Sequence, residues 1–340
     1  MAKAVKLADI AEKVGVSVVT VSKALSGQKG VSDEMRSRIE KLAEELGYVQ
    51  PSVAKRRAQQ SSYNIGVLIQ ESYLDRYASF YWQMYQQVAR HTVGLGSFTL
   101  LEVVTVQMER DLELPKLLLE DKVDGVIVIG TLSEQYLRVL TANPSFPVVF
   151  MDFIDEQRSA DSVISDSFYG AYYITNYLFD MGHKDIAYVG TLMATGSITD
   201  RYLGYTKSLM EHGMPFREDW IIADREMSSG IINEDTLLKL PEKMPTAFFC
   251  NCDLTAGMLI RKLERAGYRI PEDISVVGYD NYIYPGLCDV EITSYEVNMS
   301  EMASEAVDIL LKKISHEPYR GGIHIIEGRL IEKNSVKKLN

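Results

Sequence analysis

The sequence predicts an α/β core of two doubly wound parallel-sheet lobes, preceded by an all-α helix-turn-helix domain. From residue 63 onward, short β-branched runs alternate with amphipathic helical patterns, as in parallel sheets covered by helices on both faces. Residues 5–46 instead show helical spacing with caps and no strand pattern. At 340 residues the chain is long enough for two or three domains.

The N-terminal segment is predicted to form three short helices. Gly15 ends the first, Ser17 and Thr20 flank the start of the second, and Ser32 is the expected N-cap of a third that ends at Gly47. The residues expected on the buried faces are Leu7, Ile10, Ala11, Val14, Val21, Ala24, Leu25, Met35, Ile39, Leu42 and Leu46. Two helices joined by a tight turn are typical of the helix-turn-helix motif, whose second helix lies in the DNA major groove.

The start of the second helix would face the groove. Hydroxyl groups and Lys23 can bind phosphates or base edges, and a valine can contact a thymine methyl. The expected DNA-binding residues of this helix are Ser17, Val18, Val19, Thr20, Ser22 and Lys23. Residues 1–60 carry a formal charge of +4, whereas the remaining 280 residues carry −15, so only the first segment attracts a polyanion. A three-helix bundle without a nucleic-acid partner remains the alternative.

The core strands are predicted from seven apolar runs spread over about 230 residues, which suits two sheets better than one. These runs are IGVLIQ, FTLLEVVTV, DGVIVIG, PVVFMD, DIAYVG, TAFFCN and ISVVGYD. We expect a DNA-binding domain at 1–47, a hinge segment at 48–62 and an effector-binding core at 63–340. The expected limits are about 63–164 plus 293–323 for lobe 1 and about 165–292 plus 324–340 for lobe 2.

Polar residues follow several predicted strands at their carboxyl ends, where sheets of this kind bind ligands. Asp152 follows one apolar run, Asn251 and Asp253 follow another, and Asp280 follows a third. Arg201 lies near the start of a predicted helix and can donate a forked pair of hydrogen bonds. Carboxylates, amides and an arginine converging on one cleft suit a polyhydroxylated ligand. Each of the polar strand-end residues alone is also compatible with a helix cap.

Signals for catalysis, metal binding or export are sparse. The five histidines lack metal-ligand spacing, and His183 is expected to be structural. Cys250 and Cys252 are expected to act as small hydrophobic residues, and three cysteines fit a reducing cytoplasm. No nucleophile elbow, phosphate loop, signal peptide or membrane span is recognisable. We therefore expect no catalytic residue, no metal, no cofactor and no membrane partner.

Segments along almost the whole chain closely resemble the lactose-repressor/galactose-repressor (LacI/GalR) family. They are VKLADIAEKVGVSVVTVSKALSGQKGVSDEMRSRIEKLAEELGY, NIGVLIQ, VDGVIVIG, MGHKDIAYVG, DRYLGYTKSLMEHG, CDLTAGMLIRKLERAGYRIPEDISVVGYDN and EITSYEVNMSEMASEAV. The resemblance implies a cytoplasmic transcription regulator, most simply a repressor. Its homodimer would form through the core and bind a palindromic operator. The core would be periplasmic-binding-protein-like, type I, and sense a small-molecule effector.

The resemblance also implies roles for individual residues. Positions matching Arg201, Asp253 and Asp280 line the effector site in the family, Asp152 lies nearby, and Phe80 or Tyr81 matches a position that stacks on the ligand. This chain departs from the family in its long aromatic segment ESYLDRYASFYWQMYQQ and in Met227, where relatives carry an aromatic residue. The expected effector is a sugar or glycoside. A nucleobase, a sugar phosphate or a phosphoprotein corepressor remains open.

The joint between the two parts, YVQPSVAKRRAQQSS, departs most from the family. In the family this joint folds into a short helix on the operator's minor groove, where a leucine wedges between the central base pairs. Here Arg57 occupies the wedge position and Pro51 falls one place late. The DNA-binding residues expected in the joint are Tyr48, Val53, Lys55 and Arg57. A solvated linker is the alternative for the joint. For the whole chain, the alternative is a carbohydrate-binding module or degenerate enzyme that oligomerises through its N-terminal helices.

Overall fold

The computed structural model describes most of the chain in two compact units, Met1–Ser62 and Tyr63–Asn340. The described residues are 7–25, 31–45, 62–74, 80–143, 146–227, 230, 232, 238–282, 284 and 286–339. No helix among these residues is long and apolar enough to cross a membrane.

The first unit contains the three predicted helices. They are α1 (Leu7–Val14), α2 (Val18–Leu25) and α3 (Asp33–Glu45). Ile10, Val21 and Ile39, one from each helix, are fully buried against one another and form its small core. The Arg36 guanidinium donates to the carbonyl oxygen of Ala24 at 2.8 Å and fastens α3 to the end of α2. The helix-turn-helix prediction is confirmed; Leu46 and Gly47 lie outside the described residues.

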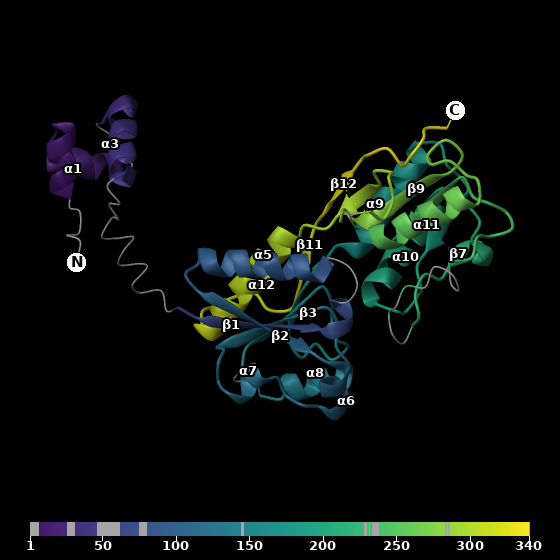
Figure 1. Ribbon diagram of the computed structural model, residues 1–340, viewed down its shortest axis with the longest axis horizontal. Helices are drawn as coiled ribbons and strands as arrows, with labels where there is room; N and C mark the ends of the chain where they lie inside the picture. The colour runs from purple at the N-terminus through teal and green to yellow at the C-terminus, as the bar shows by residue number, and fades with distance from the viewer. Residues whose placement is uncertain are drawn as a thin grey trace. The chain divides into compact units, whose positions relative to one another are not determined.

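The second unit consists of two α/β lobes (Figure 1). The elements of lobe 1 are β1 (Asn64–Gln70), η1 (Glu71–Tyr73), α5 (Phe80–Gly94), β2 (Phe98–Val104), α6 (Val106–Asp111), α7 (Lys116–Leu119), β3 (Gly125–Ile129), α8 (Glu134–Leu140), β4 (Val148–Met151), β5 (Asp161–Ser165), α12 (Met299–Ile314) and β11 (Ile323–Ile326). The elements of lobe 2 are α9 (Ser167–Asp180), β6 (Ile186–Val189), α10 (Gly196–Glu211), η2 (Glu218–Trp220), β7 (Ile221–Ile222), β8 (Ala247–Cys250), α11 (Asp253–Arg265), β9 (Ser275–Asp280), β10 (Thr293–Glu296) and β12 (Arg329–Ile331).

The two sheets have the same strand order. It is β11-β5-β4-β3-β1-β2 in lobe 1 and β12-β10-β9-β8-β6-β7 in lobe 2. All neighbouring strands pair in parallel except β10 and β12, which are antiparallel. Parallel pairing places the carboxyl ends of the central strands at one edge of each sheet, and the predicted pair of doubly wound lobes is confirmed.

Helices cover both faces of the lobe 1 sheet, with α5 and α12 on one face and α6, α7 and α8 on the other (Figure 1). Alternate residues of the central strands therefore enter different parts of the core. Val67 and Ile69 of β1 belong to the cluster of α5 and α12, whereas Leu68 packs with Tyr136 and Leu140 of α8. Burial on both faces explains the continuous apolar runs in the sequence.

The lobe limits expected from the sequence were wrong at two strands. β10, at 293–296, pairs with β9 and belongs to the sheet of lobe 2, although these residues were assigned to lobe 1. β11, at 323–326, pairs with β5 and belongs to the sheet of lobe 1, although most of it was assigned to lobe 2. The chain crosses between the lobes after β5, after β10 and after β11, and α12 lies in lobe 1 as expected.

Candidate effector site

A cavity of about 360 Å³ is lined by residues of both lobes. Its volume lies within the range of small-molecule binding sites. The lining residues are Ser72, Tyr73, Phe80, Tyr81 and Asp152 from lobe 1 and Thr195, Ser197, Ile198, Arg201, Arg225, Gly230, Ile232, Asn251, Cys252, Leu254, Met258, Asp280 and Tyr284 from lobe 2. Most of them follow the carboxyl end of a strand or begin the next helix, because parallel strands direct these segments to one edge.

Lobe 1 contributes an aromatic wall and one carboxyl group. The rings of Tyr73 and Tyr81 lie 4.5 Å apart between centroids, and Phe80 contacts Tyr81 edge-on at 5.4 Å. Asp152 follows β4 with a φ of 72°, in the left-handed region. Burial raises the pKa of Asp152 to about 6, against the opposing influence of Arg201 and a hydrogen bond from Tyr81.

Lobe 2 contributes a buried arginine, Arg201, to the cavity lining. The Nη1 of Arg201 donates to the carbonyl oxygen of Asn251 at 2.6 Å, and its Nη2 lies 3.3 Å from Oδ1 of Asp280. Its guanidinium also stacks on the Tyr279 ring, 3.8 Å from the centroid. Burial raises the pKa of Asp280 to about 7 even though Arg201 lowers it, and nearby Asp152 adds to the increase. Part of the Asp280 population is therefore protonated at neutral pH.

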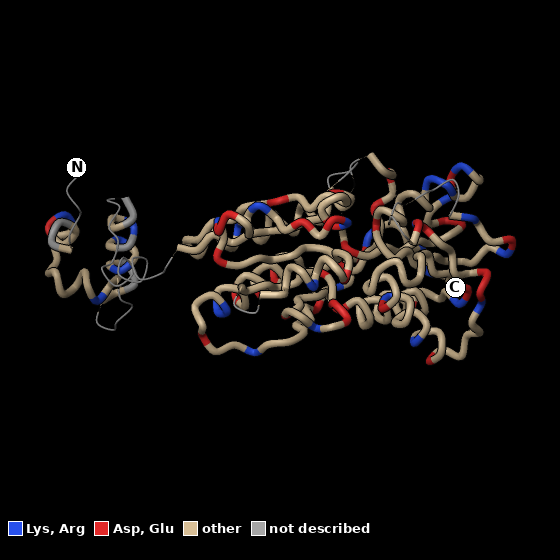
Figure 2. The backbone as a smooth tube through the Cα atoms, turned by 90° about the horizontal axis from the view of Figure 1, so that it is seen from below, with Lys and Arg blue, Asp and Glu red and all other residues tan. Residues whose placement is uncertain are grey.

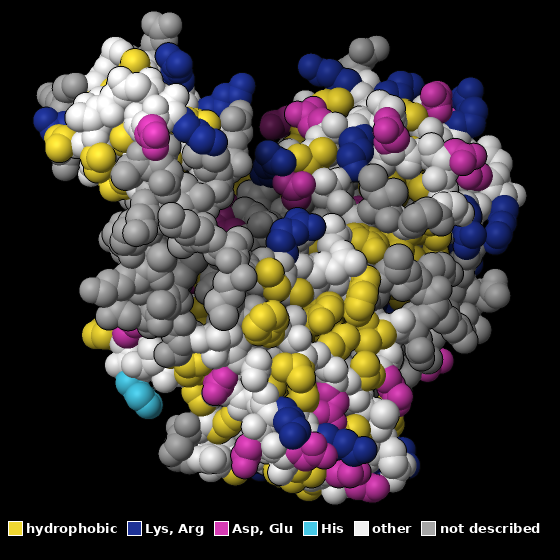
Figure 3. All heavy atoms as spheres, turned by 60° about the vertical axis from the view of Figure 1, so that its left-hand side comes forward, with side chains coloured by type: hydrophobic (Ala, Val, Ile, Leu, Met, Phe, Trp, Pro, Cys, Tyr) yellow, Lys and Arg dark blue, Asp and Glu magenta, His cyan; other side chains and the backbone are white. Residues whose placement is uncertain are grey.

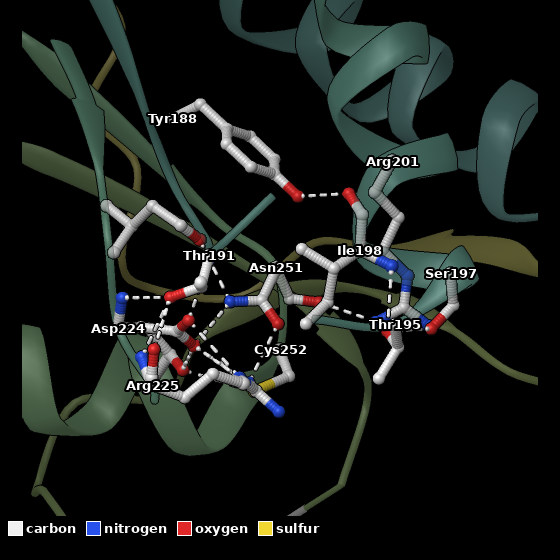
Figure 4. Close-up of polar contacts among 12 residues, drawn as sticks. Tyr188, Thr191, Thr195, Ser197, Ile198, Arg201, Asp224, Arg225, Asn251 and Cys252 are labelled. Carbon is white, nitrogen blue, oxygen red and sulfur yellow. Dashed lines mark hydrogen bonds and ion pairs between the residues drawn. The ribbon is translucent and has the colours of Figure 1, made fainter. Parts of the chain in front are cut away.

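A second ion pair lies beside Asn251. The Nε and Nη2 of Arg225 donate to the carboxylate of Asp224 at 3.1 and 2.7 Å (Figure 4). Asp224 is fully buried and also accepts hydrogen bonds from the Thr191 main chain, Asn251 Nδ2 and Thr255 Oγ1. Although burial acts in the opposite direction, Arg225 and these hydrogen bonds lower the pKa of Asp224 to about 2. Both members of the pair are therefore charged at neutral pH.

Six of the seven expected effector-binding residues line this cavity, and Asp253 does not. The six are Phe80, Tyr81, Asp152, Arg201, Asn251 and Asp280. The Asp253 carboxylate accepts hydrogen bonds from the main chain of Tyr282 at 2.8 Å and from Ser294 Oγ at 3.0 Å. An ideal Cβ on Gly278 would lie 2.0 Å from Asp253 Oδ1, so only glycine leaves room for this carboxylate. Asp253 therefore joins α11 to the end of β9 and does not line this cavity, so its expected effector contact stays a prediction.

The sequence interpretation missed the pair Asp224 and Arg225 and the aromatic residues Tyr73 and Tyr284. The same strand-end rule applies to Asp224 and Arg225, because they follow β7, but a strand of two residues gives no recognisable apolar run. Met227, which the sequence comparison placed where relatives carry an aromatic residue, is 64% exposed and does not line the cavity. Arg225, two residues earlier, supplies the cavity side chain of this loop instead.

Three further expectations from the sequence concern His183, the cysteines and metal binding. His183 donates from Nε2 to the Lys337 carbonyl oxygen at 3.0 Å, and its Nδ1 is hydrogen-bonded to Thr246 Oγ1 at 3.0 Å, which is a structural role. Cys250 is fully buried, as expected, whereas Cys252 lines the cavity. Among the described residues, no group of three His, Cys, Asp or Glu side chains is arranged to hold a metal ion.

The helix-turn-helix unit presents the residues expected to meet DNA. Ser17 accepts a hydrogen bond from the Thr20 main chain at 3.1 Å and caps α2, while Val18 and Val19 are 45% and 63% exposed. Ser22 and Lys23 are also exposed. Exposed valines at a helix start are unfavourable in water, which favours a partner surface there. The joint residues Tyr48, Val53, Lys55 and Arg57 lie outside the described part of the chain, so their roles remain predictions.

Comparison with known proteins identifies two domains. Residues 6–51 match the model of bacterial regulatory proteins of the lacI family, and residues 175–336 match a periplasmic binding protein-like domain. The chain therefore joins a DNA-binding domain of the lacI family to a periplasmic-binding-protein-like core. It is therefore a DNA-binding transcription regulator, in agreement with the expected absence of enzymatic activity.

Relatives and solved structures match across nearly the whole chain. The HTH-type transcriptional repressor PurR of Vibrio campbellii (strain ATCC BAA-1116) is 29% identical over 342 residues, covering 98% of each chain. PurR of Aliivibrio salmonicida (strain LFI1238) is 28% identical over 97% of this chain and 98% of its own. The same fold occurs in the lac repressor dimer bound to operator and the anti-inducer ONPF (TM-score 0.64, 24% identity, 98% and 100% covered). It also occurs in the CelR–cellobiose complex (TM-score 0.68, 23% identity, 97% and 99% covered).

Proposed function

We propose that this regulator is a repressor whose operator affinity is controlled by a small-molecule effector bound between the two lobes. The observation that supports this function is the shared cavity, in which Asp152 of lobe 1 lies with Arg201 and Asp280 of lobe 2. A ligand that contacts both lobes favours one angle between them and shifts the population toward it. In a dimer, that angle sets the spacing of the two DNA-binding units.

The effector we propose is a small ring compound that carries several hydrogen-bonding groups. The Tyr81 ring can stack on one face of the ring, and Arg201 and the two carboxyl groups can bind its polar edge. A sugar or glycoside fits this description, and so does a nucleobase. The comparisons do not favour a sugar: the whole-chain relatives are repressors named PurR, and cellobiose is bound in a neighbour that shares only the fold.

The regulator is proposed to act as a homodimer on a palindromic operator in the cytoplasm. One helix-turn-helix unit is small and only mildly basic, so two units held at a fixed spacing bind far more tightly than one. Acidic residues are interspersed with basic ones along the core (Figure 2), and the 280 residues after residue 60 carry a formal charge of −15, which does not favour DNA binding by the core. One face of the molecule gathers hydrophobic side chains (Figure 3). Exposed apolar residues of the core such as Val93 and Phe98 suit burial against a second copy.

The joint is proposed to set the preference at the operator centre. Arginine in a minor groove is attracted to narrow A·T-rich tracts, whereas an apolar wedge kinks the DNA. We therefore expect selected operators to have an A·T-rich centre and to bend less than sites bound through a leucine. A strictly C·G centre, or strong kinking that Arg57→Leu leaves unchanged, would count against this role for Arg57.

The central experiment measures operator binding with and without candidate effectors. A thermal-shift screen of sugars, nucleosides, nucleobases and phosphosugars identifies ligands, because a ligand that binds the native state raises the melting temperature. Each hit is then tested for its effect on binding to an operator obtained by sequence selection. The sensor function fails if no compound in a broad panel changes either quantity.

The oligomerisation alternative is tested by truncation. A chain lacking residues 1–60 should lose all operator binding and keep its ligand-dependent melting shift, because the cavity lies entirely within Tyr63–Asn340. If the N-terminal helices only oligomerised the chain, the full-length protein would show no sequence-specific DNA binding at all.

A further inference from the structure

Two arginines of the effector cavity, Arg201 and Arg225, both bond to Asn251. Asn251 lies between Arg201 and Arg225 (Figure 4). Its carbonyl oxygen accepts from Arg201 Nη1 at 2.6 Å, and its side-chain oxygen accepts from Arg225 Nη2 at 3.0 Å. Both guanidinium groups line the same cavity. Two positive charges are thus held close together within a site that is open to a ligand.

The two arginines differ in their remaining donors. Arg225 uses Nε and Nη2 for Asp224, Asn251 and Cys252. Its Nη1 has no hydrogen-bond partner in the described part of the chain, and the side chain is 16% exposed. The Nη1 and Nη2 of Arg201 are directed at Asn251 and Asp280, its Nε has no partner among the described residues but is buried, and the side chain is only 6% exposed. The two N–H groups of Arg225 Nη1 are therefore donors that no described residue uses.

We propose that Arg225 forms an oxyanion subsite of the effector cavity, so that the effector carries a carboxylate or phosphate group. The subsite rests on the function proposed above and narrows the class of effector to acidic ring compounds. A carboxylate or phosphate suits Arg225 because charge-assisted bonds to a fixed guanidinium are roughly twice as strong as neutral ones. The bonds to Asp224 and Asn251 hold the guanidinium in place before the ligand arrives, which limits the entropy lost on binding.

The acidic residues around the cavity are compatible with an anionic ligand. The Asp224 carboxylate is enclosed by donors and fully buried, so it does not face the ligand. Asp280 lies beside Arg201, and Asp152 is held by Tyr81. Burial raises the pKa of Asp152 to about 6 and that of Asp280 to about 7, so each can take up a proton and become a donor to an oxyanion. The other uncharged titratable groups of the cavity stay neutral between pH 6 and 8 because burial raises their pKa; they are Tyr73, Tyr81, Cys252 and Tyr284.

The test compares ring compounds with and without an oxyanion. The probes are glucose with glucuronate, uracil with orotate, and inorganic phosphate against chloride at matched ionic strength, all added to the full-length chain. We expect at least one oxyanion probe to raise the melting temperature and to bind at least tenfold more tightly than its neutral counterpart. Its affinity should increase as the pH falls from 8 to 6, because most of the Asp280 population and part of the Asp152 population then become neutral.

Three variants assign the effect to Arg225. Arg225→Met should abolish the oxyanion-dependent shift, and Arg225→Lys should keep only part of it, since an ammonium lacks the fork. Asp224→Asn with Arg225→Met removes the buried charge that the single variant would leave unpaired, and it should lose the shift as well. Arg269→Met is the matched control: Arg269 also makes a two-pronged bond to a neighbouring aspartate, Asp273, but lies on the surface at 71% exposure.

The subsite is ruled out if no oxyanion probe has an effect, if the neutral probes bind equally well, or if both Arg225 variants keep the oxyanion shift. If Arg269→Met also lost the rise in melting temperature caused by the oxyanion probe, the effect would be a non-specific one of charge and would not support the subsite. These failures are separable from failure of the sensor function. A neutral ligand that changes operator affinity identically in wild type and Arg225→Met would leave the sensor function standing while excluding this subsite.

Discussion

The two lobes share one strand order but present different chemistry to the cavity. In both lobes an aspartate of the cavity stands at the end of the fourth strand, counted from the β2 edge in lobe 1 and from the β7 edge in lobe 2. These residues are Asp152, directly after β4, and Asp280, the last residue of β9. Both aspartates have positive φ, 72° and 99°, which turns the chain sharply at the sheet edge. Lobe 1 surrounds its aspartate with tyrosines, whereas lobe 2 places Arg201 beside Asp280.

The difference indicates separate roles for equivalent positions. In lobe 2 the charged groups at the cavity are bonded to each other and to the main chain, so they help to hold α10, β8 and β9 together. In lobe 1 the Asp152 carboxyl group has a hydrogen bond from Tyr81 and no ion pair within the described part of its own lobe, so it is available to a ligand. The predictions below test this contrast, from the largest expected effect to the smallest.

The largest effect is expected from Arg201→Met. It leaves the carboxyl group of Asp280 buried without its cation and the Asn251 carbonyl without its donor. Removing one member of a buried pair typically costs about 3–5 kcal/mol of unfolding free energy. Urea unfolding of the full-length chain, followed by tyrosine and tryptophan fluorescence, measures the loss. A cost below that of the surface variant Arg269→Met would show that the lobe 2 charges do not stabilise the fold.

Helix packing in lobe 2 should tolerate less change than in lobe 1. An ideal Cβ on Gly204 of α10 would lie 2.1 Å from the carbonyl oxygen of Phe168 in α9, a main-chain atom that cannot move alone. On Gly125 of β3 the nearest atom is a Leu310 methyl at 2.9 Å, which can rotate away. We expect Gly204→Ala to cost about 1–3 kcal/mol and Gly125→Ala less, as measured by urea unfolding. Equal costs would contradict the tighter packing of α9 on α10.

Sequence reasoning found those site residues that follow long apolar strands. Asp152, Asn251 and Asp280 lie in the cavity because the carboxyl ends of parallel strands meet there, and that rule needs no structure. The rule does not give the direction of a side chain: Asp253 begins α11 but faces Gly278. It also missed Arg225, since β7 is only two residues long.

The lobe boundary failed for a related reason. β10 has the sequence TSYE and β11 the sequence IHII, both short and flanked by loops, so neither run shows which sheet it joins. Membership is decided by pairing partners more than a dozen residues away, Val277 to Asp280 for β10 and Ser162 to Ser165 for β11. Nonlocal pairing of this kind leaves no periodicity within the strand itself.

The stability contributions of Asp152 and of the ion-paired Asp224 should respond oppositely to pH. A pKa raised to about 6 means that Asp152 favours the fold when protonated, so its contribution is full below pH 4 and is lost as the pH rises through 6. Asp152→Asn should therefore raise stability by about 1–3 kcal/mol at pH 8, where the upper figure corresponds to the whole rise of that pKa from its ordinary value of 3.8 to about 6, and change it little at pH 4. Asp224, with a pKa of about 2, stabilises the fold above pH 4 and loses this contribution as the pH falls through 2. Thermal unfolding between pH 4 and 8 compares Asp152→Asn with Asp224→Asn, and a destabilised Asp152→Asn at pH 8 would contradict the contrast.

The smallest effect is expected from Tyr81→Phe, which removes the hydroxyl group that bonds to Asp152 and keeps the ring beside Tyr73. A single hydrogen bond contributes about 1 kcal/mol or less when its partner can still reach water. Because this bond lowers the pKa of Asp152, its loss should raise that pKa further above 6. The difference in melting temperature between Tyr81→Phe and Tyr81→Phe with Asp152→Asn, followed against pH, measures the displaced titration. A midpoint that stays in place or moves to lower pH would mean that lobe 1 does not hold its carboxyl group through Tyr81. The distinction between the two lobes would then rest on Arg201 alone.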